Sequence, residues 1–261
     1  MLDLYYIYLL YLILIGTFTF ISIFINWQFS CINCQFGNLK KKYKIISLDG
    51  NIGAGKSTLL KILNDYIIQY NIKNISIVEE PVNVWESTGI LKKFYENKNQ
   101  NAGIFQLFVL ETLVHAIQDK LNTLNNSNDT HIIITERSLD STKWVFAQML
   151  YDDGDISYEA MESYLYIYNK IDKLYLPSAT IYLNTPPEIC NERIIKRNRD
   201  GEIISNEYLI KCDSYYKNMI KDIRNREHFN SNLSSVLEID ANANGDIICK
   251  QILNFIYLGL N

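Results

Sequence analysis

The sequence predicts an α/β protein in which helices flank one five-stranded parallel sheet. From Lys41 onward, short β-rich runs alternate with longer helical stretches, which is the pattern of parallel strands joined by crossover helices. The glycine-rich segment G-N-I-G-A-G-K-S-T, at Gly50–Thr58, lies between the first apolar run and the first helical pattern. Charged residues also follow the ends of several runs, where ligands bind in such sheets.

Five short runs rich in β-branched and apolar residues predict the strands. In chain order they are Tyr43–Leu48, Ser76–Glu79, His131–Thr135, Thr180–Leu183 and Val236–Ile239. Apolar residues that recur every three or four positions predict helices at Lys56–Tyr70, Gly103–Leu124, Ser138–Tyr151, Tyr158–Leu174, Pro187–Arg199 and Ile247–Leu258. The Asn-rich stretch Asn122–Asp129 predicts a loop.

The composition is that of one globular domain with a small appendage, which we divide into residues 1–40 and 41–261. The net charge of −4 and the pI of about 5.5 argue against a nucleic-acid partner, because such proteins usually carry a basic excess. The five cysteines lack the spacing of a disulfide framework, which indicates a reduced, intracellular domain.

The first forty residues form a separate hydrophobic segment. No charged residue lies between Asp3 and Lys40, and Tyr5–Ile25 is an almost continuous apolar run of bilayer-spanning length. Lysines follow at positions 40–42, and positive charge on that side places the rest of the chain in the cytosol. We therefore expect a membrane anchor on a cytoplasmic domain. Two alternatives stay open: a misassigned start, which would leave a soluble cytoplasmic protein, or another targeting role.

The glycine-rich segment has the form of a phosphate-binding loop. Its backbone N–H groups can point at a polyphosphate, and the following helix adds the positive end of its dipole. Lys56 can reach the β- and γ-phosphates, and Ser57 can hold Mg²⁺. The predicted nucleotide-binding residues of this loop are Gly50, Asn51, Ile52, Gly53, Ala54, Gly55, Lys56, Ser57 and Thr58.

Charged residues of the kind that phosphoryl transfer requires follow the other strands. Glu80 follows the second strand, and Glu136 and Arg137 follow the third. Phosphoryl transfer needs positive charge around a developing polyanion and a carboxylate that accepts the proton of the attacking hydroxyl. The helix after the fourth strand adds three cations, which are Arg193, Arg197 and Arg199.

Five motifs together resemble the deoxynucleoside kinases of the deoxycytidine, deoxyguanosine and mitochondrial thymidine kinase family. They are G-N-I-G-A-G-K-S-T, E-P-V-N-V-W, the F-Q of Phe105-Gln106, E-R-S and R-I-I-K-R-N-R, and the resemblance spans Lys41 to Leu258. It implies a P-loop NTPase fold with an arginine-bearing lid and a homodimer. The implied reaction is the ATP- and Mg²⁺-dependent phosphorylation of the 5′-hydroxyl of deoxynucleosides, a step of nucleotide salvage.

The same resemblance implies roles in catalysis. Glu80 matches the general base that receives the 5′-hydroxyl proton, with Arg137 near the reacting oxygen and Lys56 on the phosphates. Glu136 matches the partner of Mg²⁺ beside Ser57. The lid residues that would close on the phosphates are Arg193, Arg197 and Arg199.

Nucleoside recognition is implied in the same way. Gln106 matches the amide that pairs with the base edge, because an amide offers a donor and an acceptor side by side. Phe146 matches the aromatic that stacks on the base and Trp85 the wall behind it, with plain core packing as the alternative for both. Tyr95 and Glu207, the latter in the expected loop N-E-Y-L, match the pair that binds the 3′-hydroxyl.

Two departures bear on specificity. The purine and deoxycytidine branches carry an arginine and an aspartate where this chain has Leu113 and Thr142, whereas thymidine-accepting and multisubstrate members are uncharged there. This favours thymidine and deoxycytidine over purines. Two other functions stay open: a thymidylate-type monophosphate kinase and a noncatalytic structural subunit with the same fold.

Overall fold

The computed structural model describes residues 43–124, 130–199, 202–229, 235–240 and 245–258. All of these lie in the second of two compact units, Tyr43–Asn261. The expected membrane anchor at residues 5–25 lies outside the described residues, so the anchor and the separate segment 1–40 remain predictions. None of the helices in the described part combines the length and apolar character needed to cross a bilayer.

The sheet has five parallel strands in the order β2-β3-β1-β4-β5, which confirms the predicted strands and architecture. The strands are β1 (Tyr43–Gly50), β2 (Ile75–Val78), β3 (His131–Glu136), β4 (Ala179–Asn184) and β5 (Ser235–Asp240). In this register Leu48 of β1 lies beside Glu136 at the end of β3. The segments that follow β1 and β3 therefore emerge side by side at the carboxyl edge of the sheet, where open α/β sheets bind ligands.

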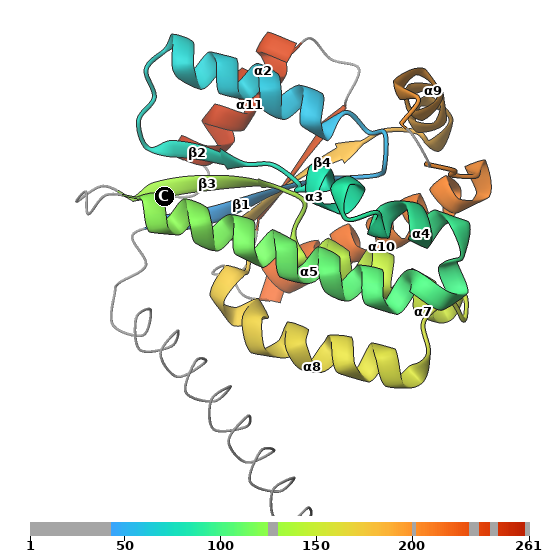
Figure 1. Ribbon diagram of the computed structural model, residues 1–261. Coiled ribbons are helices and arrows are strands. Elements are labelled where there is room, and N and C mark those ends of the chain that lie inside the picture. Colours follow the sequence, from blue (N-terminus) through green and yellow to red (C-terminus); the bar gives the residue numbers. More distant parts are fainter. Residues whose placement is uncertain (1–42, 125–129, 200–201, 230–234, 241–244, 259–261) are drawn as a thin grey trace, which may run out of the picture. The chain divides into compact units, whose positions relative to one another are not determined.

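Helices cover both faces of the sheet (Figure 1). On one face lie α2 (Lys56–Gln69) and α11 (Gly245–Leu258), and on the other lie α5 (Lys98–Thr123), α8 (Tyr158–Tyr175) and α10 (Asn206–Phe229). The side chains of β1 are divided between these two layers, because successive residues of a strand point to opposite faces of the sheet. Ile46 and Leu48 pack with the α2 layer, whereas Ile45 packs with the α5 layer.

The helix predicted at Ser138–Tyr151 is instead three pieces. They are α6 (Leu139–Ser141), the π-helix η1 (Thr142–Ala147) and α7 (Gln148–Asp152). The Ser138 side chain caps the first piece by accepting a hydrogen bond from the Ser141 N–H at 3.0 Å. A π-turn adds a residue to the helical turn and often occurs at functional sites. Here Val145 and Phe146 both pack against α10, and Phe146 also lines a cavity.

Other helices differ in their ends or lack a predicted counterpart. α9 (Pro187–Arg197) ends before Arg199, because Asn198 adopts a left-handed conformation with φ of 47°. Asn97 caps α5, which therefore begins before Gly103: its side chain accepts a hydrogen bond from the Gln100 N–H. The helices without a predicted counterpart are α3 (Val82–Ser87), α4 (Ile90–Glu96) and α10.

Candidate active site

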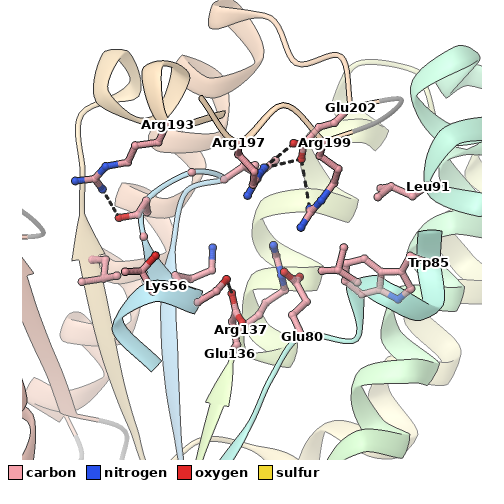
Figure 2. Close-up of a pocket in the computed structure, with 18 of the residues that line it drawn as sticks. Lys56, Glu80, Trp85, Leu91, Glu136, Arg137, Arg193, Arg197, Arg199 and Glu202 are labelled. Carbon is pink, nitrogen blue, oxygen red and sulfur yellow. Dashed lines mark hydrogen bonds and ion pairs between the residues drawn. The ribbon is translucent and has the colours of Figure 1, made fainter. Parts of the chain in front are cut away.

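A cavity of about 700 Å³ opens at the carboxyl edge of the sheet, a volume within the usual range of small-molecule sites. Figure 2 shows arginines on one side of it and the strand-end charges facing them from the other. The structure thus brings together residues that lie far apart in the sequence. The predicted site residues beyond the phosphate loop that line it are Glu80, Trp85, Tyr95, Gln106, Glu136, Arg137, Phe146, Arg193, Arg197 and Arg199.

The phosphate loop lines one end of this cavity from Ile52 to Thr58. Gly53 has a φ of 78°, and a Cβ there would lie 2.5 Å from the carbonyl oxygen of Cys190, so only glycine fits between the loop and α9. Gly50 and Asn51 are not among the lining residues. The Asn51 side chain is buried, and its amide donates to the Leu209 carbonyl at 2.9 Å, a hydrogen bond that connects the loop to α10.

Lys56 lies at the base of the loop with its ammonium group turned toward the cavity. Its Nζ donates to the carbonyl oxygens of Gly50 at 2.9 Å and Asn51 at 3.1 Å. Burial lowers the pKa of Lys56, and the neighbouring Arg137 lowers it further, while nearby carboxylates raise it. A bound polyphosphate would supply the negative charge that best offsets this burial.

The groups expected to hold Mg²⁺ meet beside Lys56. The Ser57 hydroxyl donates to Glu136 Oε1 at 2.7 Å, and Glu136 is buried. A hydroxyl and a carboxylate are oxygen ligands of the kind that Mg²⁺ prefers, with phosphate oxygens and waters completing its shell. No cluster of three or more His, Cys, Asp or Glu side chains forms a metal site in the described part of the chain. By their chemistry, the Ser57 hydroxyl and the Glu136 carboxylate fit a magnesium ion.

Arg137 and Glu80 form a buried ion pair in the middle of the cavity. Arg137 Nε donates to Glu80 Oε1, and the guanidinium lies over the Phe146 ring at 4.1 Å from its centroid. Burial, the largest single influence, would lower the pKa of Arg137, but Glu80, Tyr216 and Asp49 together outweigh it, so that the pKa is raised and the side chain stays cationic. A cation and a carboxylate thus lie together where the two ends of the cavity meet.

The arginines of the predicted lid cover the opposite side of the cavity (Figure 2). Arg193 Nη1 donates to the Ala54 carbonyl of the phosphate loop at 2.7 Å. Arg197 donates to both carboxylate oxygens of Glu202, at 2.8 and 2.6 Å. Arg199 Nε lies 2.8 Å from a carboxylate oxygen of Glu86 on α3 and also contacts Glu202. All three arginines line the cavity, and each is held by a backbone carbonyl or a carboxylate.

The other end of the cavity carries an amide among aromatic side chains. Gln106 is 3% exposed, and its Oε1 has no hydrogen-bond partner among the described residues. Trp85 is also buried, and its Nε1 donates to Thr112 Oγ1 at 2.9 Å, which fixes the indole. Tyr95 lies close to the arginine-bearing segment: burial raises the pKa of its hydroxyl, and Glu202 raises it further.

Glu207 is not brought into the cavity. The expected loop is the first turn of α10, and the Glu207 side chain is exposed. Glu202 lines the cavity instead, with its side chain only 3% exposed, and sequence reasoning missed it. Its position three residues after Arg199 could have indicated that it lies near the lid arginines. Leu113 and Thr142, used for the specificity prediction, are both buried and do not line the cavity.

Comparison with known proteins agrees with the motifs. The sequence model described as deoxynucleoside kinase matches residues 46–255. A probable deoxycytidine kinase of Fowlpox virus (strain NVSL) is 33% identical over 224 residues, which is 83% of this chain and 84% of the viral protein. A putative kinase protein of Invertebrate iridescent virus 3 is 28% identical over 213 residues, covering 81% of this chain and 95% of its own.

A third relative is named for another base. The deoxyguanosine kinase of Dictyostelium discoideum is 31% identical over 210 residues, covering 78% of this chain and 66% of its own. The differing names of these relatives leave the preferred base of this chain undetermined, whereas the matched family extends over most of the described structure. The chain therefore belongs to the deoxynucleoside kinase family and is an enzyme of that class.

Proposed function

We propose that the protein transfers the γ-phosphoryl group of ATP to the 5′-hydroxyl of a deoxynucleoside, in nucleotide salvage, with thymidine or deoxycytidine as acceptor. The main support is the position of the Glu80–Arg137 pair. It lies between the phosphate loop, at one end of the cavity, and Gln106 with its aromatic neighbours, at the other. A proton acceptor and a cation are needed at the point where a phosphate meets a hydroxyl.

The cavity divides into a donor end and an acceptor end. The phosphates of ATP would lie over the phosphate loop, and its nucleoside would extend toward Ile62, Gly245 and Ile248, which line the cavity beyond the loop. The acceptor would lie between Trp85 and Phe146. This assignment places apolar walls around both bases and charge only between them, as the chemistry of the two substrates requires.

In the proposed step, the 5′-hydroxyl loses its proton to Glu80 as its oxygen bonds to the γ-phosphorus. The bond from that phosphorus to the β,γ-bridging oxygen breaks, and ADP leaves with the bonding electrons. Lys56, Arg137 and the lid arginines would stabilise the charge on the transferring group. Mg²⁺, when bound, neutralises charge on the β- and γ-phosphate oxygens, and Ser57 and Glu136 would hold it.

Selection of the acceptor would depend on few polar contacts. The free Oε1 of Gln106 can accept from the N3–H of thymine or the amino group of cytosine, and Phe146 would stack on the ring. Glu202, rather than Glu207, would bind the 3′-hydroxyl with Tyr95, because both line the cavity and lie close together. Leu113 and Thr142 do not line the cavity, so the preference for a pyrimidine over a purine rests on the resemblance to thymidine-accepting members at these two positions.

A homodimer and a cytoplasmic location belong to the same proposal. Helices α5 and α8 pack against each other and carry exposed apolar side chains, including Ile104, Tyr158 and Tyr166, which a second copy would cover. An N-terminal anchor would hold this cytoplasmic domain at a membrane. The molecular mass of the full chain in detergent, by light scattering, tests the dimer.

The deciding experiment is an acceptor profile. The full chain is incubated with ATP, Mg²⁺ and, in turn, each of the four deoxynucleosides and thymidylate, and phosphate transfer is followed for each. We expect transfer to thymidine or deoxycytidine. A purine preference would keep the reaction and refute the base assignment, while transfer to thymidylate alone would favour a monophosphate kinase. Lys56→Ala should abolish turnover, and no transfer to any acceptor by a folded, ATP-binding wild type would favour a structural role.

A further inference from the structure

We propose that Asp49, the residue before the phosphate loop, is a positioning residue that fixes the turn carrying Glu136 and Arg137. Its side chain does not line the cavity, and Asp49 is not among the predicted site residues. The inference rests on the proposed function, since Glu136 and Arg137 are the groups that the turn presents to the substrates. Three features of Asp49 support it: its hydrogen bond, the backbone it holds, and its charge.

The turn is held in a conformation that side chains rarely adopt. Arg137 has a φ of 76°, in the left-handed region that is unfavourable for any residue with a Cβ. Such a conformation persists only where the surroundings hold it. Because φ is the rotation about the Arg137 N–Cα bond, it sets the direction in which the Arg137 side chain and the following Ser138 leave the end of β3, where Glu136 lies.

Two consecutive residues of β1 hold two consecutive amides of this turn. The Arg137 N–H donates to the Leu48 carbonyl at 3.0 Å, and the Ser138 N–H donates to Asp49 Oδ1 at 3.2 Å. Any residue at position 48 supplies the first acceptor, because it is a backbone carbonyl. The second is a side-chain oxygen, so it depends on the residue type at position 49.

Asp49 is fully enclosed, which makes its charge costly unless cations lie nearby. Its second oxygen, Oδ2, has no hydrogen-bond partner in the described part of the chain. Lys56 and Arg137 supply the balancing charge: Asp49 is among the groups that raise the pKa of each. The carboxylate therefore acts on the two cations from outside the cavity, which it does not line.

The test compares Asp49→Ala, Asp49→Asn and Ser47→Ala by kcat, the KM values for the acceptor and ATP, and thermal unfolding. Asn keeps an oxygen that the Ser138 N–H can reach, whereas Ala does not. Ser47 is the matched control: it is equally buried, lies on the same face of β1, and its hydroxyl donates to Thr180 Oγ1 at 3.1 Å without touching the turn.

We expect Asp49→Ala to lower kcat by about a hundredfold, the scale of a small displacement of catalytic groups. Asp49→Asn should restore kcat to within about tenfold of the wild type, and acceptor KM should change less than about twofold in both variants, because Gln106 and Trp85 are untouched. Ser47→Ala should lower the melting temperature and keep kcat. Equal kcat for the Ala and Asn variants, or a kcat for Asp49→Ala no lower than that of Ser47→Ala, would overturn the proposal.

A structural readout separates this proposal from the proposed function. The readout is the φ of Arg137 in a crystal structure of Asp49→Ala, or of Asp49→Asn if the first does not fold. We expect this φ to leave the left-handed region in a variant that loses the Ser138 hydrogen bond and to stay there in a variant that keeps it. This outcome does not depend on activity, so an inactive wild type would refute the proposed function alone. An unchanged Arg137 φ in a folded Asp49→Ala would refute the positioning role alone.

Discussion

Gln106→Met should weaken acceptor binding and at the same time stabilise the free enzyme. Gln106 is buried, and its Oε1 has no partner among the described residues, so the free enzyme carries an unsatisfied acceptor. Such a group costs roughly 1–3 kcal/mol. Methionine matches the shape of the side chain without that oxygen. We therefore expect the free energy of unfolding to rise by about 1 kcal/mol, which is a rise in melting temperature of about 2–4 °C for a domain of this size.

The loss of binding follows from the same atoms. Two hydrogen bonds between the amide and a base edge contribute about 1–3 kcal/mol together. Their removal should raise the acceptor Kd by roughly 5- to 150-fold, while the Kd for ATP stays within about twofold, because the phosphate loop is untouched. Isothermal titration calorimetry with thymidine or deoxycytidine measures the first quantity and with ATP the second. Differential scanning calorimetry of the ligand-free protein measures the stability.

Gln118→Met is the matched control, on the same helix α5 but outside the cavity. Gln118 Nε2 donates to the Tyr175 hydroxyl at 2.8 Å, so its replacement breaks a formed hydrogen bond. We expect this variant to lose stability and to keep acceptor affinity. An acceptor Kd for Gln106→Met within twofold of the wild type would remove Gln106 from the site. A fall in stability of that variant would show that the amide is satisfied in the free enzyme.

Three further tests address other parts of the site. Glu80→Gln should lower kcat by at least about a hundredfold while the acceptor Kd stays within a few-fold, because the amide oxygen of glutamine can still accept from Arg137 but cannot take up the proton. Steady-state kinetics and calorimetry measure the two quantities, and an equal loss of both would contradict this role. Gly53→Ala and Gly89→Ala both place a side chain at a φ above 70°, but Gly89 has open space around it, whereas a Cβ on Gly53 meets the Cys190 carbonyl at 2.5 Å. Gly89→Ala should therefore lower the free energy of unfolding, measured by chemical denaturation, by only about 1 kcal/mol and keep activity. Gly53→Ala should lower it further and also raise the KM for ATP. Equal losses in the two variants would show that the loop and α9 separate easily. Glu202→Gln should raise acceptor KM by about tenfold or more, and Glu86→Gln by less than about threefold because its ion pair with Arg199 is partly exposed to solvent. The reverse order would place Glu86, not Glu202, at the nucleoside.

The sheet and the loops at its carboxyl edge were predictable because their signals are local. Short apolar runs define the strands, and the phosphate loop has a fixed spacing of glycines. Helix α10 escaped prediction although its buried residues Leu209, Cys212, Tyr216 and Ile220 recur every three or four positions. The charged and amide residues between them dilute that pattern, and only the packing of α10 against η1 and β4 shows that the stripe is buried.

The site residues that could not be predicted depend on geometry between distant segments. Glu202 and Glu207 both follow the arginines closely, and only the start of α10 at Asn206 decides that Glu207 faces away. Likewise, Asp49 becomes informative only when the register of β1 and β3 places it beside Ser138. The π-helix that brings Phe146 to the cavity has no signal in the apolar period of its segment.

The contacts between the phosphate loop and α9 distinguish Arg193 from Arg199. At the loop, Gly53 packs against the Cys190 carbonyl and the Ala54 carbonyl accepts from Arg193, so α9 is attached to the loop at two points. Asn198, in its left-handed conformation, ends the helix just beyond these contacts. Beyond it, Arg199 is held only by side-chain ion pairs, to Glu86 on α3 and to Glu202, so its movement away from the cavity would break ion pairs and leave both contacts of the loop intact. Arg193 is thus anchored to the backbone of the phosphate loop, whereas the contacts of Arg199 are of the kind for which a bound anion competes.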